Sequence, residues 1–189
     1  MHHAPPSDHS HLLGSLSRYR RQWPAEAEVV DLFEALLDDP EAPFERARLA
    51  GHFTASSWLV DRSGTRTLLT HHRKLGRWLQ LGGHADGDMD LARVALREAT
   101  EESGLEGLVG EAKIFDLDRH WIPERGAVPG HWHYDVRYVV RAEAGEEFVV
   151  SEESLDLAWR EVAQVLEDPE ADPSLRRMAE KWVARSARQ

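Results

Sequence analysis

The sequence predicts an α/β protein preceded by a helical N-terminal segment. Its 189 residues suit one domain of ordinary size with a substantial core. Segments with the patterns of β-strands stand on both sides of one strongly helical segment, residues 90–103. Helical patterns also come before the first strand and after the last. We therefore expect a disordered tail over residues 1–10, a helical extension over 11–51 and an α/β domain over 52–189.

The composition argues against several classes of protein. Cysteine is absent, which removes disulfides, thiolate metal sites and cysteine nucleophiles. The formal net charge is −11, so a nucleic-acid-binding surface is not expected, because such surfaces depend on clustered positive charge. No apolar run is long enough to span a membrane, and residues 1–6 lack the apolar core of a signal peptide. We expect a cytoplasmic protein that meets any polyanionic ligand with local cations or a metal.

The N-terminal extension is predicted to be helical. Residues 12–21 form one expected helix and residues 25–39 a second, which Pro24 opens and Pro40 closes. A third, short helix is expected over residues 44–51. These segments could shape substrate specificity, cap the sheet or mediate a homodimer. We favour a structural role because they carry no recognisable functional pattern.

The strands of the main domain follow from alternation and from turn residues. The first two expected strands are separated by Asp61-Arg62-Ser63-Gly64, which predicts a β-hairpin. Two helices, over 161–166 and 173–188, are expected to end the chain. The expected strands cover residues 53–60, 65–70, 78–81, 112–121 and 131–141.

A basic stretch, residues 71–77, follows the hairpin. Its charges could simply solvate a connection. Alternatively, Arg73, Lys74 and Arg77 could neutralise the phosphates of a substrate, since they stand out in an otherwise acidic protein. The sequence leaves both readings open. Arg77 is the best single candidate for phosphate binding because it adjoins a short strand that leads into a glycine pair.

The helix predicted over 90–103, which Gly104 is placed to end, has an unusual inner face. This face begins apolar at Leu91 and continues into Glu98 and Glu102. Carboxylates at this spacing repel each other, and turning them toward a core adds a desolvation cost. A hard divalent cation, Mg²⁺ or Mn²⁺, would make the arrangement tolerable because the available ligands are oxygens. The alternative is a solvated acidic helix end, which we rank lower because arginines already mark the outer face.

The stretch from Gly83 to Leu105 resembles the Nudix box, whose pattern is G-x5-E-x7-R-E-U-x-E-E-x-G-U with U apolar. One position departs from the pattern, because Met89 replaces the first glutamate. The resemblance implies the Nudix fold, an α/β/α sandwich around a mixed β-sheet, and hydrolysis of a nucleoside diphosphate linked to another moiety. The matching positions are Gly83, Arg97, Glu98, Ala99, Glu101, Glu102, Gly104 and Leu105.

The same resemblance implies roles for the box residues. Glu98 and Glu102 would be the main ligands of Mg²⁺, with Mn²⁺ as a substitute. Glu101 would be an additional ligand or a base, and the carbonyl oxygen of Gly83 a backbone ligand. Arg97 would orient the glutamates through an ion pair rather than contact phosphate.

A late acidic loop offers further candidates. In the Nudix family a glutamate from such a loop is sometimes the catalytic base, which makes Glu152 and Glu153 candidates for that role. The implied substrate is a small nucleotide or a nucleotide sugar. Isopentenyl-diphosphate isomerases have a related fold, but their active-site cysteine has no counterpart in this sequence.

Met89 leaves two functions open. The chain could be an active hydrolase, or a non-catalytic nucleotide sensor that kept the fold. We favour activity because the helix glutamates are intact. Asp88 or Asp90 could pair with Arg97 or cap the helix in place of the missing glutamate.

The expected strand over 131–141 has one unusually polar face. His133, Asp135 and Arg137 share it with His131, and strands of a covered sheet do not normally carry such a row. We expect the row to line a cleft and to contact the substrate or its water. The pair His131-x-His133 also resembles half of a zinc site, but no third ligand is evident, so zinc is not predicted.

Overall fold

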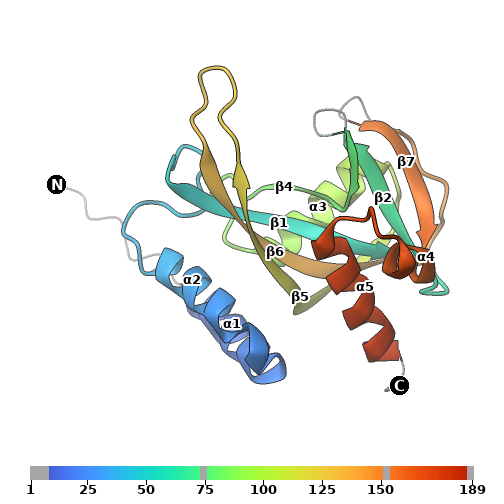
Figure 1. Ribbon diagram of the computed structural model, residues 1–189, viewed down its shortest axis with the longest axis horizontal. Coiled ribbons are helices and arrows are strands. Elements are labelled where there is room, and N and C mark those ends of the chain that lie inside the picture. Colours follow the sequence, from blue (N-terminus) through green and yellow to red (C-terminus); the bar gives the residue numbers. More distant parts are fainter. Residues whose placement is uncertain (1–8, 73–75, 151–153, 187–189) are drawn as a thin grey trace.

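One mixed seven-stranded sheet forms the centre of the protein (Figure 1). The computed structural model describes residues 9–72, 76–150 and 154–186. Its strands are β1 Gly51–Val60, β2 Arg66–His72, β3 Arg77–Leu79, β4 Leu81–His84, β5 Leu108–Ile122, β6 His131–Ala142 and β7 Ser154–Glu161. The strand order is β3, β2, β1, β6, β5, with β4 also paired to β1 and β7 to β2. β1 and β6 run parallel while β1 and β2 form the predicted antiparallel hairpin, so the sheet is mixed as expected.

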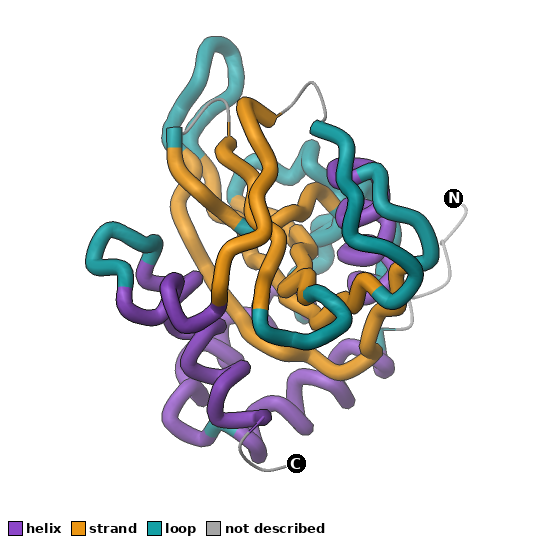
Figure 2. Tube along the Cα trace, turned by 90° about the vertical axis from the view of Figure 1, so that its right-hand side faces the viewer, coloured by secondary structure: helices purple, strands orange, loops and turns teal. Residues whose placement is uncertain are grey.

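Helices cover both faces of this sheet (Figures 1 and 2). The buried side chains of α1 Ser10–Gln22, α2 Ala27–Leu37 and α3 Leu91–Ser103 form one cluster with Val136 of β6. α4 Val162–Glu167 and α5 Pro173–Ser186 pack with Val139, which alternation places on the opposite face of the strand. A short 3₁₀ helix, η1 Pro24–Glu26, joins α1 to α2. The arrangement confirms an α/β/α fold with N-terminal helices.

The ends of α3 follow directly from its sequence. The side chain of Asp90 accepts a hydrogen bond from the backbone N–H of Arg93 at 3.1 Å, which caps the first turn. Gly104 adopts the left-handed conformation, with φ 66°, and ends the helix. Asp90 and Gly104 therefore begin and end the helix as the sequence predicts.

The prediction of a short helix over residues 44–51 is wrong. This segment forms successive turns that lead into β1. The N–H of Arg48 donates to the carbonyl oxygen of Glu45 at 3.0 Å, and the Arg48 guanidinium donates to the carbonyl oxygen of Gly51 at 2.6 Å. Phe44 stacks on Phe53 with 4.9 Å between ring centroids. Packing of this aromatic pair and side-chain bonds to the backbone outweigh the weak helical propensity.

Two other expectations concern the ends of the chain and the membrane. α1 begins at Ser10, and residues 1–8 of the expected tail lie outside the described residues. Within the described ranges, no helix combines the length and the apolar character needed to cross a membrane.

Candidate active site

A cleft of about 400 Å³ brings the motif helix and the polar row of β6 together. β1 contributes Thr54 and Ser56, and β4 contributes its glycine pair and His84. Glu98 reaches the cleft from α3, and His133 and Asp135 reach it from β6. Residues far apart in the sequence therefore meet at one end of the sheet.

The glutamates of α3 lie against the glycine pair of β4. The carboxylate of Glu98 occupies the space that a Cβ at Gly83 would fill, so a larger residue at this position would collide with it. Glu102 accepts a hydrogen bond from the N–H of Gly82 at 3.2 Å. Glycine at position 83 therefore lets β4 and α3 approach closely, whereas a Cβ at Gly82 would collide with Ser56 of the neighbouring strand β1.

Arg97 holds this arrangement from the side. Its guanidinium donates to Glu98 Oε1 at 2.9 Å and to the carbonyl oxygen of His84 at 3.2 Å. The geometry is that of a positioning ion pair. Glu101 is exposed on the same helix, one position before Glu102.

These residues fit a hard divalent cation. Glu98 and Glu102 supply carboxylate oxygens, and the glycine segment beside them supplies backbone carbonyls, which are the donors that Mg²⁺ prefers. The room left by the missing Cβ at Gly83 is what allows the Glu98 carboxylate to sit beside the strand. Glu98, Glu102 and the carbonyl of Gly83 are the residues that would hold the ion.

The polar row of β6 divides into two parts. Asp135 lines the cleft and accepts hydrogen bonds from Thr54 at 3.0 Å and from Ser56 at 2.7 Å. Arg137 is only 1% exposed, and its Nε donates to Asp135 at 2.8 Å. Arg137 is not among the described residues that line the cleft. We expected it to contact the substrate, but it instead holds Asp135 from behind.

Arg137 is also one member of a buried ion network around Asp116. Asp116 is fully buried and pairs with Arg137 at 3.3 Å, with Arg177 at 2.7 Å and with Lys181 at 2.7 Å. Burial alone would raise the pKa of Asp116, but the hydrogen bond from Arg177 and the charges of Arg137 and Lys181 outweigh it and hold the pKa below its usual value. Lys181 also donates to the hydroxyl of Tyr19 at 2.6 Å, which ties α5 to α1.

The basic stretch before β4 is divided in a similar way. Arg77 lies outside the lining of the cleft and borders another hollow, where it pairs with Asp172 at 3.4 Å. Arg73 and Lys74 lie outside the described residues, as do the candidate bases Glu152 and Glu153. In the described part of the chain, Arg46 is the arginine that lines the cleft.

Five histidines gather at and beneath the cleft. The ring centroids of His52, His84, His120 and His131 lie between 5.0 and 5.5 Å from that of His133. Burial, and then the neighbouring His84, lowers the pKa of His133 to about 2. Burial, and then the charge of Arg46, lowers the pKa of His84 to about 4. Both imidazoles are therefore neutral at neutral pH.

Several cleft residues escaped the sequence analysis. Arg46 lies in the segment that was expected to be a helix, which hid its proximity to the motif. Thr54 and Ser56 interrupt an apolar strand at alternate positions, and this alternation is a signal that could have identified them. His52 could not be found this way, because its position beside His133 depends on the register of β1 against β6.

The residues around Met89 have their own partners. Asp90 caps α3, and Asp88 pairs with Arg93 at 2.7 Å rather than with Arg97. Met89 is 41% exposed and borders a surface hollow outside the cleft. The departure from the motif therefore lies outside the lining of the cleft.

The family follows from the sequence as a whole. Residues 50–182 match the family described as the NUDIX domain, which is most of the chain. The chain therefore belongs to the Nudix hydrolase family, whose members are typically pyrophosphohydrolases. The predicted resemblance is confirmed.

Solved structures share the fold. A C. elegans Ap4A hydrolase in a binary complex is 16% identical with a TM-score of 0.56, covering 72% of this chain and 98% of that one. The MutT protein of Methanosarcina mazei is 16% identical with a TM-score of 0.57, covering 74% and 97%. The Nudix domain of Shewanella oneidensis NrtR, cocrystallised with ADP ribose, is 22% identical with a TM-score of 0.50, covering 82% and 97%. At these identities the likeness to solved structures shows the fold alone. A comparison with curated protein sequences found no match.

Proposed function

We propose that this chain is a Mg²⁺-dependent pyrophosphohydrolase that cleaves the diphosphate linkage of a nucleoside diphosphate joined to another moiety. The observation that carries the proposal is the placement of Glu98 at the cleft, against Gly83 and paired with Arg97. In the reaction, the oxygen of water bonds to phosphorus, the bridging P–O bond breaks, and a base accepts the proton of the water.

Each residue of the motif has a task in this reaction. Glu98 and Glu102 hold the cation, and Arg97 fixes the orientation of Glu98. A bound Mg²⁺ supplies neutralisation of phosphate charge and lowers the pKa of its water. The base is one of Glu101, which belongs to the motif, and Glu152 and Glu153, which belong to a late acidic segment of the sequence.

The substrate side of the cleft suits a nucleotide of modest size. Arg46 lines the cleft and pairs with Asp86, an exposed partner that a substrate phosphate would replace. The volume of about 400 Å³ is in the range of small-molecule sites. ADP-ribose and dinucleoside polyphosphates are reasonable first substrates. One similar structure is an Ap4A hydrolase, and another is a Nudix domain in complex with ADP ribose.

A turnover assay tests the proposal. ADP-ribose, Ap4A and nucleoside triphosphates would each be incubated with the protein and Mg²⁺ or Mn²⁺, and release of nucleoside monophosphate would be measured. We expect turnover of at least one substrate and a fall in kcat of about 100-fold or more in Glu98→Gln. The matched control is Glu106→Gln, an exposed glutamate beyond the end of α3, which should behave as the parent protein.

The same assay separates the hydrolase from the sensor. Nucleotide binding without turnover of any substrate would contradict the proposal and favour the non-catalytic alternative. Equal rates in Glu98→Gln and the parent protein would contradict the assignment of Glu98 as a metal ligand.

A further inference from the structure

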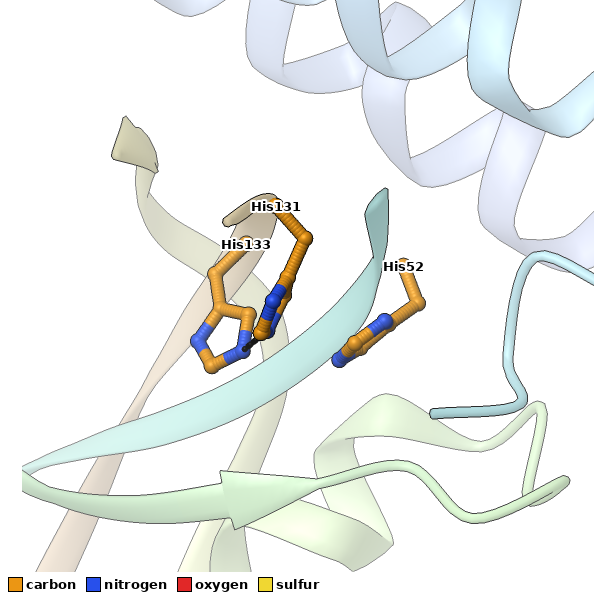
Figure 3. Close-up of side chains that lie close together, drawn as sticks. All are labelled: His52, His131 and His133. Carbon is orange, nitrogen blue, oxygen red and sulfur yellow. Dashed lines mark hydrogen bonds between the residues drawn. The ribbon is translucent and has the colours of Figure 1, made fainter. Parts of the chain in front are cut away.

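Three histidines from two strands converge, and one of them, His133, also lines the cleft (Figure 3). His52 stands near the start of β1, and His131 and His133 stand on β6. His52 is the direct register partner of His133 in the parallel pair, so both side chains point to the same face of the sheet. One nitrogen from each ring, either Nδ1 or Nε2, lies within 4.8 Å of one nitrogen of each of the other two rings.

Backbone carbonyls fix which nitrogen of two rings carries a proton. Nδ1 of His131 lies 2.9 Å from the carbonyl oxygen of Pro129, and Nδ1 of His52 lies 3.2 Å from that of Arg48. A carbonyl oxygen only accepts hydrogen bonds, so in each neutral ring Nδ1 is the donor and Nε2 carries the lone pair. This is the arrangement in which metal-ligating histidines are held by their surroundings.

The Nε2 atoms of these rings have too few hydrogen-bond donors facing them. Nε2 of His52 is buried and has no hydrogen-bond partner among the described residues. Nε2 of His131 lies 3.2 Å from Nε2 of His133, so one proton at most serves two nitrogens. Buried lone pairs of this kind cost free energy unless something positive faces them.

We propose that His52, His131 and His133 bind a Zn²⁺ ion through their Nε2 atoms. Nitrogens bound to tetrahedral zinc at 2.0–2.1 Å lie roughly 3.3 Å apart. The pair His131 and His133 already has this spacing, at 3.2 Å. One ring nitrogen of His52 lies within 4.8 Å of a nitrogen of each other ring, so an adjustment of the His52 side chain is needed to bring its Nε2 to this spacing.

The donor chemistry selects zinc over the metal of the motif. Mg²⁺ prefers oxygen ligands, whereas neutral imidazole suits Zn²⁺. Three histidines are the protein ligands of an open zinc site, which leaves a fourth position for water or for an oxygen of a molecule bound nearby. His133 also lines the cleft that contains Glu98, so the zinc site would adjoin the proposed Mg²⁺ site without sharing a ligand with it.

Metal binding can be measured without any substrate. The full chain would be loaded with Zn²⁺ in excess Mg²⁺, dialysed, and its metal content determined. We expect one Zn²⁺ per chain, and addition of Co²⁺ to the metal-free protein should give the visible absorption of a tetrahedral nitrogen site. His52→Gln should reduce the Zn²⁺ affinity by about 10-fold or more, because two ligands remain.

Two control variants separate this site from other histidines. His71→Gln changes a histidine of the same sheet that stacks on Trp78, and it should bind Zn²⁺ as the parent does. A variant with His2, His3 and His11 all changed to glutamine should also keep one Zn²⁺, which tests for adventitious binding by N-terminal histidines.

Three results would overturn the proposal. These are no retained Zn²⁺ in the parent protein, equal affinity in His52→Gln, or loss of the ion in the N-terminal variant. If His52→Gln does not fold, X-ray absorption of the zinc-loaded parent decides, since three imidazole ligands support the site and fewer contradict it. The proposal is independent of the proposed hydrolase, because Zn²⁺ binding is measured directly and turnover with Mg²⁺ is measured separately.

Discussion

The polar side chains at the two ends of the row on β6 differ in how completely they are paired. At one end, Arg137 is enclosed by Asp116, Asp118 and Asp135, and each of these carboxylates has at least one charged or polar partner. At the other end, beneath the cleft, His131 and His133 share one short contact and face a buried His52 nitrogen that has no hydrogen-bond partner among the described residues. The same strand alternation places both groups on one face of the sheet.

The difference teaches how to separate structural from functional polar residues. Charges that satisfy one another completely hold elements together, and Lys181 reaching from α5 to Asp116 of β5 is an example. Buried groups with unused lone pairs, or carboxylates gathered beside a glycine strand, are arranged for a ligand. A variant at the Asp116 end should therefore change stability, and a variant at the cleft end should change binding or rate.

The largest expected effect is at Asp116. Asp116→Asn leaves Arg137, Arg177 and Lys181 without their shared carboxylate in a buried site. We expect the free energy of unfolding to fall by about 3–5 kcal/mol, measured by urea denaturation.

The control for this prediction is Asp31→Asn, which removes an exposed partner of Arg20. Its unfolding midpoint should match that of the parent protein, since exposed ion pairs contribute little. Equal effects of the two substitutions would show that the Asp116 network does not stabilise the fold.

The next effect is on rate. Glu102→Gln keeps an oxygen that can accept the hydrogen bond from Gly82 but removes the negative charge that would hold the cation. We expect kcat to fall by about 100-fold or more with an unchanged unfolding midpoint, measured by turnover and by urea denaturation. An unchanged rate, or a loss of folding, would place Glu102 with the structural group instead.

Acid should weaken the Asp116 network. The pKa of Asp116 is lowered in the folded protein, so its contribution to stability is fully present above the unfolded-state pKa of about 4 and is lost as the pH falls toward the lowered value. The difference in unfolding free energy between the parent protein and Asp116→Asn should therefore shrink between pH 7 and pH 3. A difference that stays constant over this interval would contradict the lowered pKa.

The motif and its helix could be predicted because their signals are local. Glu98 and Glu102 share a helix face by spacing alone, and Asp90 and Gly104 end that helix by chemistry carried within a few residues. The partners of β6 were not predictable in this way. Arg137 meets Arg177 through their shared Asp116, and His52 meets His133, only because β5, β1 and α5 pack around one strand in a particular register. Sequence periodicity identified the polar row. It could not show which end is buried in an ion network and which end lies at the cleft.

The smallest expected effect is at Met89, where the sequence departs from its motif. Met89 is exposed and borders a hollow other than the cleft, and Asp90 already supplies the cap of α3. Met89→Glu should therefore change kcat and the apparent Mg²⁺ affinity by less than about threefold, measured by turnover over a range of Mg²⁺ concentrations. The matched control is Met89→Gln, which adds a polar side chain of similar length without the charge. If Met89→Glu instead created turnover in a protein that otherwise had none, the natural chain would be a nucleotide-binding form of the fold whose activity depends on that single missing charge.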